Sequence, residues 1–118
     1  MDKQTLLYEN LKNIKDFWVK TSGEGLVPDA KLVWSDCKEQ YQLLQKTIKT
    51  EDEVSAYKAV INEVIKGVMH SILVMIDGGD DLADNYLIDL VDEKTKESLK
   101  KGIELHDEFI GYLLDAGE

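Results

Sequence analysis

The feature that most constrains the fold is a long stretch of apolar residues with helical spacing, Val54–Ile76. Its apolar positions recur every three or four residues and spread to nearly all faces after Val68. Thr50 and Glu53 have the spacing of a capping box just before it, and the glycines of residues 77–79 suit a helix C-terminus. We therefore predict one long helix whose later turns are surrounded by the other helices.

Three further segments repeat this helical spacing. Residues 3–21 place apolar side chains at intervals of four, three and four: Leu7, Leu11, Ile14 and Trp18. A second helix is expected to begin near Pro28, with a seam of Ala30, Trp34, Cys37, Tyr41, Leu44 and Ile48. A last helix is predicted over about residues 103–114. Both tryptophans and Cys37 are interpreted as core residues on these seams.

Between the long helix and the last helix the apolar period changes to two. Tyr86, Ile88 and Leu90 alternate with their neighbours, which predicts one short strand. Residues 92–101 suit either a hairpin with a strand around Ser98-Leu99 or a short helix. The expected fold is mainly α, a bundle of about four helices with a short β-strand or β-hairpin, in one domain over residues 1–118. Alternatives are a ferritin-like arrangement without metal, or an α+β fold whose hairpin joins a partner's sheet.

The charge of the chain is strongly negative and unevenly placed. The net charge is −10, and residues 60–118 carry fourteen acids against five lysines. Five aspartates of the segment after the long helix form the predicted partner-binding site: Asp80, Asp81, Asp84, Asp89 and Asp92. Such a surface repels nucleic acid and anionic lipid and attracts a basic protein partner. The absence of arginine also excludes guanidinium clamps on phosphate or carboxylate.

The sequence suggests a cytoplasmic protein. The first residues lack the apolar stretch of a secretory signal. The longest unbroken apolar run is Ile72–Ile76, far shorter than the roughly 20 residues that cross a bilayer, so we expect no membrane span. The single cysteine, Cys37, fits a reducing compartment.

Most catalytic and metal-binding motifs are missing. The segment that starts at Asp77 fails as a calcium loop, because Gly79, Leu82 and Ile88 occupy positions where ligands or a glycine are required. One cysteine and two distant histidines match neither zinc spacings nor di-iron Glu-x-x-His pairs. A Gly-x-Ser-x-Gly elbow and a phosphate-binding loop are also missing. We predict no catalytic residue, no cofactor and no metal.

One alternative uses the histidines. His106 is expected to be partly buried on the last helix, with Asp107 and Glu108 beside it. His70 is followed two turns later by Asp77, so both side chains could point the same way. The alternative function is therefore a small metal-binding protein or enzyme that uses His106 and nearby carboxylates.

Residues 69–114 resemble a loose set of small uncharacterised bacterial proteins. The resemblance rests on three segments: Ile76-Asp77-Gly78-Gly79, Asp89-Leu90-Val91-Asp92-Glu93-Lys94-Thr95 and Leu105-His106-Asp107-Glu108-Phe109. In those proteins a glycine follows the threonine of a β-hairpin, whereas Lys96 stands there in this chain. Some of them resemble immunity proteins, the acidic partners that neutralise a toxin made by the same cell.

The leading hypothesis is an acidic, cytoplasmic protein-binding module, of the immunity or antitoxin type, that inhibits a basic partner protein. The resemblance and the charge agree, because an acidic surface docks rapidly onto a cationic one. A third possibility is a homo-oligomer-forming module without another partner.

Overall fold

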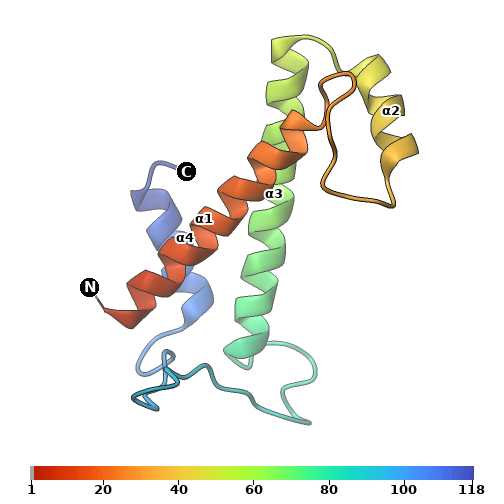
Figure 1. Cartoon of the computed structure of the whole chain (residues 1–118). Helices are drawn as coiled ribbons and strands as arrows, with labels where there is room; N and C mark the ends of the chain where they lie inside the picture. The colour runs from red at the N-terminus through yellow and green to blue at the C-terminus, as the bar shows by residue number, and fades with distance from the viewer. Residues whose placement is uncertain (1) are drawn as a thin grey trace. The chain divides into compact units, whose positions relative to one another are not determined.

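The computed structural model describes residues 2–118, and over these residues the chain forms four α-helices and no strand (Figure 1). The helices are α1 (Lys3–Glu24), α2 (Lys38–Thr47), α3 (Glu51–Ile76) and α4 (Leu105–Asp115). A long loop, residues 77–104, joins α3 to α4. The prediction of a mainly α-helical bundle with about four helices is therefore confirmed.

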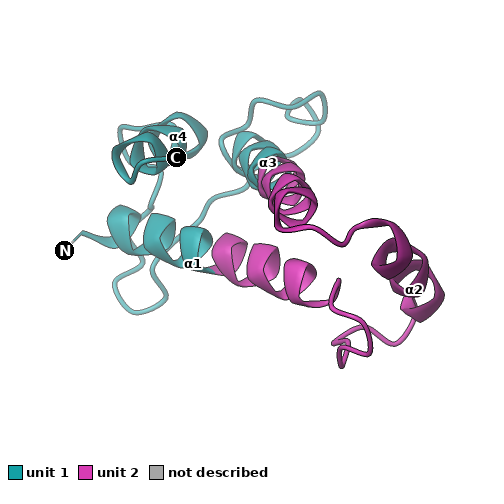
Figure 2. Ribbon diagram, turned by 90° about the horizontal axis from the view of Figure 1, so that it is seen from above, with its two compact units in different colours: residues 1–13, 66–118 teal, residues 14–65 magenta. Residues whose placement is uncertain are grey.

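The residues group into two compact units, coloured separately in Figure 2. Unit 1 consists of the residues up to Asn13 and those from Lys66 to Glu118, and unit 2 is Ile14–Ile65. The boundary falls inside α1 and inside α3, so both helices contribute residues to each unit.

The core of unit 1 lies among the start of α1, the end of α3 and α4. Six apolar side chains are buried there: Tyr8, Met69, Leu73, Leu105, Phe109 and Leu113. The Tyr8 ring centroid lies 5.9 Å from those of Phe109 and Tyr112. These aromatic contacts attach the first turns of α1 to α4.

Unit 2 is organised around Tyr41 of α2. The Tyr41 hydroxyl donates to the carbonyl of Ser22 over 3.1 Å, and its ring stacks on Trp34 at 5.4 Å. A Cβ at Gly25 would approach the Tyr41 ring to 2.6 Å, so only glycine fits here without rearrangement. Tyr41 therefore anchors α2 to the end of α1.

The second helix begins ten residues later than predicted from Pro28. Asp29 has a φ of +63°, a left-handed conformation that a right-handed helix cannot contain. Ala30 and Trp34 consequently lie in an irregular segment, and Cys37 occupies the N-cap position of α2. The predicted continuous seam over residues 30–48 is wrong in its first half.

The face of α1 that is buried also differs from the predicted one. Ile14 and Trp18 are exposed, whereas Lys15 has only 1% of its surface exposed. Its ammonium group contacts the Asp16 carboxylate at 2.6 Å and the Asn62 side-chain oxygen at 2.8 Å. Polar partners thus allow Lys15, which the apolar spacing did not place on the buried face, to occupy a buried position.

The ends of α3 confirm the predicted caps. The Thr50 hydroxyl accepts from the backbone N–H of Glu53 at 3.1 Å, and the Glu53 carboxylate accepts from that of Thr50 at 2.9 Å. At the other end Gly78 has a φ of +79°, and the N–H of Gly79 donates to the carbonyl of Val74. This is the glycine-dependent C-terminal cap expected from the sequence.

The expectation that other helices surround the later turns of α3 is wrong. Four side chains spaced by four residues keep between 47% and 61% of their surface exposed: Val60, Val64, Val68 and Ile72. An 18-residue window of α3 has a mean hydropathy of 1.6, yet only 11% of it is buried. By length and composition α3 is long and apolar enough to cross a membrane, a test that the core helix of a soluble protein also passes.

The predicted strand or hairpin does not form over residues 86–101. The chain does reverse direction there, but with a single antiparallel bridge between Val91 and Ser98. The Asp89 carboxylate accepts the N–H of Leu90, and Asp92 accepts those of Lys94 and Thr95. The N–H of Leu90, next to the bridge, is therefore bound by a side chain and not by the opposite segment.

Candidate functional site

The five aspartates of the predicted partner-binding site all lie in the loop of residues 77–104, within unit 1. They fall into two groups that differ in their contacts. Asp89 and Asp92 are bound to other parts of unit 1, whereas Asp80, Asp81 and Asp84 precede them in a series of turns.

Asp92 has a structural role in the loop. One oxygen accepts from the backbone N–H groups of Lys94 and Thr95, both at 2.9 Å, and the other lies 3.0 Å from the ammonium of Lys3. The Thr95 hydrogen bond, with that of Lys3, lowers the pKa of Asp92 to about 2. The charge of Asp92 is thus largely matched inside unit 1.

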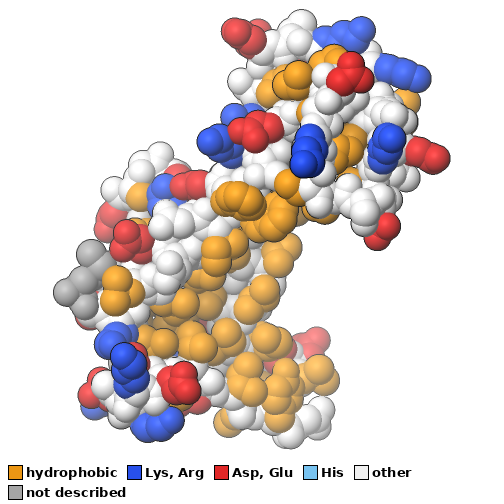
Figure 3. All heavy atoms as spheres, viewed as in Figure 1, with side chains coloured by type: hydrophobic (Ala, Val, Ile, Leu, Met, Phe, Trp, Pro, Cys, Tyr) orange, Lys and Arg blue, Asp and Glu red, His pale blue; other side chains and the backbone are white. Residues whose placement is uncertain are grey.

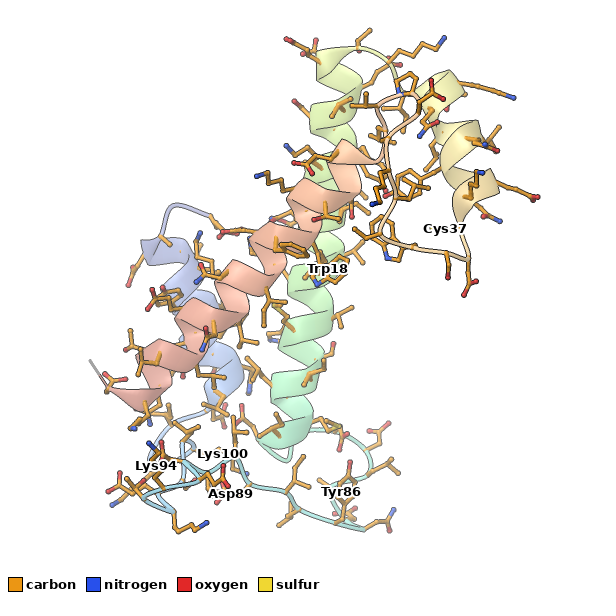
Figure 4. The ribbon with its side chains drawn as sticks, in the orientation of Figure 1. Trp18, Cys37, Tyr86, Asp89, Lys94 and Lys100 are labelled. Atoms are coloured by element: carbon orange, nitrogen blue, oxygen red, sulfur yellow. The ribbon has the colours of Figure 1, made fainter. Side chains whose placement is uncertain are left out.

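Asp89 belongs to a second set of loop contacts. Its carboxylate accepts from the Ser98 hydroxyl at 2.7 Å, which is the main reason that its pKa is lowered. Lys100 lies nearby, as Figure 4 shows, and its ammonium donates to the carbonyls of Ile76 and Ile88, both at 2.7 Å. Lys100 therefore binds the C-terminal end of α3, where the helix dipole favours a cation.

The first part of the loop has a different character. Asp81 and Asp84 are exposed, Asp80 is half-buried, and no lysine among residues 2–118 pairs with any of the three. The same segment carries three large apolar side chains that are exposed as well: Leu82, Tyr86 and Leu87. Leu87 keeps 75% of its surface exposed, and Figure 4 shows Tyr86 apart from Asp89 and Lys100.

The second candidate feature is His106 in the first turn of α4. Its ring nitrogen Nδ1 lies 2.6 Å from Oδ2 of Asp77, and its backbone N–H donates to the same oxygen at 2.9 Å. Asp77 is only 3% exposed and follows α3 directly. The sequence suggested that Asp77 and His70 share a direction, but the hydrogen-bonding partner of Asp77 is His106.

These contacts shift the pKa values of both Asp77 and His106. Burial raises the pKa of Asp77, but hydrogen bonds from the His106 backbone and ring and from the Leu105 backbone outweigh it, so this pKa lies below its usual value. The hydrogen bond to Asp77 raises the pKa of His106, while burial acts in the opposite direction. The pair favours an ionised Asp77 that accepts a hydrogen from Nδ1.

The other ring nitrogen, Nε2, faces carboxylates. Oε2 of Glu104 and Oδ1 of Asp107 each lie 3.5 Å from it, and the three ligand atoms lie within 4.8 Å of one another. The His70 ring contacts His106 edge-on, with centroids 5.4 Å apart. The structure thus brings the two predicted histidines together and adds Glu104, whereas Glu108 is not part of the group.

The sequence analysis missed Glu104 because it began the last helix at about residue 103, and residues two apart within a helix do not share a face. Glu104 is the N-cap residue of α4, with an extended backbone, so helical spacing does not relate it to His106. An acid two residues before a histidine at a helix start is the signal that could have identified it. Neither a protein-family model, nor a curated protein, nor a solved structure matches the chain.

Proposed function

We propose that the chain is a cytoplasmic protein-binding module that engages a basic protein partner through the loop segment Asp80–Leu87, called here the acidic–apolar loop. The observation that carries the proposal is the position of exposed Leu82, Tyr86 and Leu87 within eight residues of Asp80, Asp81 and Asp84 in one segment, residues 80–87. The immunity type of inhibitor, which neutralises a toxin, is the specific form that we favour.

The apolar side chains of this loop supply a contact that charge alone does not. Exposed apolar groups beside acids are typical of binding surfaces, where an aromatic or aliphatic side chain fills a pocket and charges surround it. Burying an exposed leucine contributes roughly 1.5–3 kcal/mol. Leu87 and Tyr86 are therefore the expected anchors of the interface.

The aspartates would determine which partner binds. With a net charge of −10, the chain repels anionic surfaces at long range and accelerates its encounter with a cationic one. Because no lysine of the described residues neutralises Asp80, Asp81 or Asp84, their charges remain available to a partner. Asp89 and Asp92, which the sequence included in the same site, contribute mainly by holding the loop.

The test is a binding measurement with the partner recovered from the source cell and purified. Between about 50 and about 300 mM salt we expect the affinity to fall at least about tenfold, because screening weakens the attraction of exposed charges. Asp81→Asn/Asp84→Asn and Leu87→Ser should each weaken binding by a similar factor. An affinity that neither salt nor these variants change contradicts the proposal.

A matched control is available on another element. Glu51→Gln/Asp52→Asn also removes two negative charges, but from the first turn of α3, where both side chains are exposed. This variant should bind within about a factor of two of the wild type if charge placement, rather than total charge, determines affinity. An equal loss in both double variants would indicate nonspecific attraction and would contradict a defined site.

A second candidate, assembly with a second copy of the chain, rests on the exposed side of α3. In Figure 3 apolar side chains gather along α3. Four of its exposed residues form a row at intervals of four: Val60, Val64, Val68 and Ile72. From Val64 to Ile76 this helix contains no carboxylate, so the negative charge of the chain does not oppose self-contact there. Rows at this spacing pack against one another at about −50°.

Covering a half-exposed valine contributes about 1 kcal/mol, so two such rows give a gross gain of about 8 kcal/mol. Association itself costs 4 kcal/mol or more, and we therefore expect reversible dimers. The molar mass should rise with concentration in light scattering. Val64→Glu/Val68→Glu should abolish this rise, whereas Ser55→Glu/Ala59→Glu, on another face of α3, should not. A constant monomer, or binding to phosphatidylcholine vesicles instead, contradicts self-assembly.

A further inference from the structure

The surroundings of His106 indicate a binding function that the acidic–apolar loop does not account for. Nδ1 of His106 lies 2.6 Å from Oδ2 of Asp77, so the other ring nitrogen, Nε2, is directed to the opposite side of the ring. On that side stand Glu104 and Asp107, each with a carboxylate oxygen 3.5 Å from Nε2.

The distances suit a metal ion. A tetrahedral ion with bonds of about 2.0–2.1 Å separates its ligand atoms by roughly 3.3–3.4 Å. The two observed separations of 3.5 Å from Nε2 are close to this value, and all three ligand atoms lie within 4.8 Å of one another. One imidazole with two carboxylates is a ligand set suited to zinc and related divalent ions.

Asp77 supplies an observation that is independent of the exposed carboxylates. It comes from the end of α3, its side chain is 3% exposed, and its Oδ2 holds both the ring and the backbone of His106. Metal-binding histidines commonly donate their second N–H to a carboxylate, which fixes the ring and strengthens the ligand. A cap of α4 alone would need only the backbone hydrogen bond.

The electrostatics favour a cation despite the helix start. The N-terminal end of α4 carries the equivalent of about half a positive charge, which opposes a cation there. Three carboxylates surround the imidazole, those of Asp77, Glu104 and Asp107, so negative charge predominates. We propose that Glu104, His106 and Asp107 bind one divalent transition metal ion of the zinc class, and that Asp77 is a positioning residue that orients His106.

The test uses Zn²⁺ alone, added to the metal-free full-length chain. Titration calorimetry should give one ion per chain. Glu104→Gln/Asp107→Asn should weaken binding by at least about tenfold, and both side chains are exposed, so the fold should persist. The matched control Glu93→Gln/Glu108→Gln removes two exposed acids outside the group and should stay within about twofold. No binding at about 1 mM Zn²⁺, or equal loss in both variants, overturns the proposal.

The role of Asp77 has its own readout. In ¹⁵N spectra of the imidazole, Zn²⁺ should shift Nε2 of His106 in the wild type and leave Nδ1 protonated. Asp77→Asn should weaken Zn²⁺ binding about 10–100-fold and give a mixture of ring tautomers. If this variant is unfolded by circular dichroism, the wild-type spectrum still decides, because a shift of Nδ1 instead of Nε2 contradicts the assigned geometry.

Discussion

Asp77 caps a helix that begins 28 residues after it in the chain, because its Oδ2 accepts the backbone N–H of His106 at 2.9 Å. The residue at the N-cap position of α4, Glu104, makes no side-chain hydrogen bond to the helix. The end of α3 thus supplies the cap of α4 within unit 1, and the 2.6 Å contact with the imidazole ring adds to it. This single carboxylate joins two elements that local sequence does not relate.

We expect Asp77→Ala to lower the free energy of unfolding by about 1–3 kcal/mol. The variant removes the cap and leaves two partly buried donors of His106 without this partner. Urea denaturation in the presence of a chelator measures the effect without any contribution from bound metal. Asp81→Ala removes an exposed aspartate from the same loop and should change stability by less than about 0.5 kcal/mol. Equal losses in the two variants would show that the long-range cap does not stabilise the fold.

The low pKa of Asp92 predicts how the loop responds to acid. The Thr95 and Lys3 hydrogen bonds hold this pKa at about 2, below the ordinary 3.8. The folded chain therefore binds this proton less tightly than the unfolded chain, and the stabilisation is present above pH 3.8 and lost as the pH falls through about 2. A ¹³C titration of the Asp92 carboxyl carbon should give a midpoint near 2. In Asp92→Asn the acid-induced loss of stability between these pH values should be smaller than in Glu93→Gln.

Lys96 occupies a conformation that favours glycine. Its φ is +65°, and the backbone N–H donates to the carbonyl of Asp92 at 2.7 Å. A non-glycine residue in this region costs roughly 1–2 kcal/mol, and glycine avoids this cost. Glycine also has more conformational freedom in the unfolded chain, which offsets part of the gain in stability. Lys96→Gly should therefore raise the free energy of unfolding by up to about 1 kcal/mol. Lys94→Gly, at a residue without positive φ, should lower it, and thermal unfolding of both variants checks the sign.

The parts of the fold that the sequence predicted depend on neighbouring residues. Thr50 and Glu53 contact each other across one turn, and the glycine after Asp77 ends α3 locally, so spacing alone was sufficient. The prediction of the second helix failed at Asp29, because apolar spacing gives no sign of the left-handed backbone at this residue.

The remaining differences depend on residues that are distant in sequence or on what covers a surface. The row along α3 shows that apolar spacing identifies a helix face without saying what buries it. The hydrogen bond between Asp77 and His106, which lie 29 residues apart, fixes the orientation of a histidine that is partly buried, as the sequence predicted. Spacing within a single helix could not have predicted it, and Glu104 lies outside the helix altogether.

Lys15 gives a last prediction, in unit 2 and the part of α1 that the sequence misassigned. Its ammonium is buried and contacts the side-chain oxygen of Asn62 at 2.8 Å and Asp16 at 2.6 Å. Asn62→Leu should lower the free energy of unfolding by about 1–3 kcal/mol, because a buried charge then loses an acceptor. Lys15→Met/Asn62→Leu should recover most of this loss, since an apolar pair of similar size avoids the cost of burying the charge.

Urea denaturation of the single and double variants completes a double-mutant cycle, and Asn13→Ala, at an exposed asparagine of α1, serves as the control. Additive effects of the two substitutions would mean that Asn62 does not stabilise the ammonium group and that other contacts keep Lys15 buried.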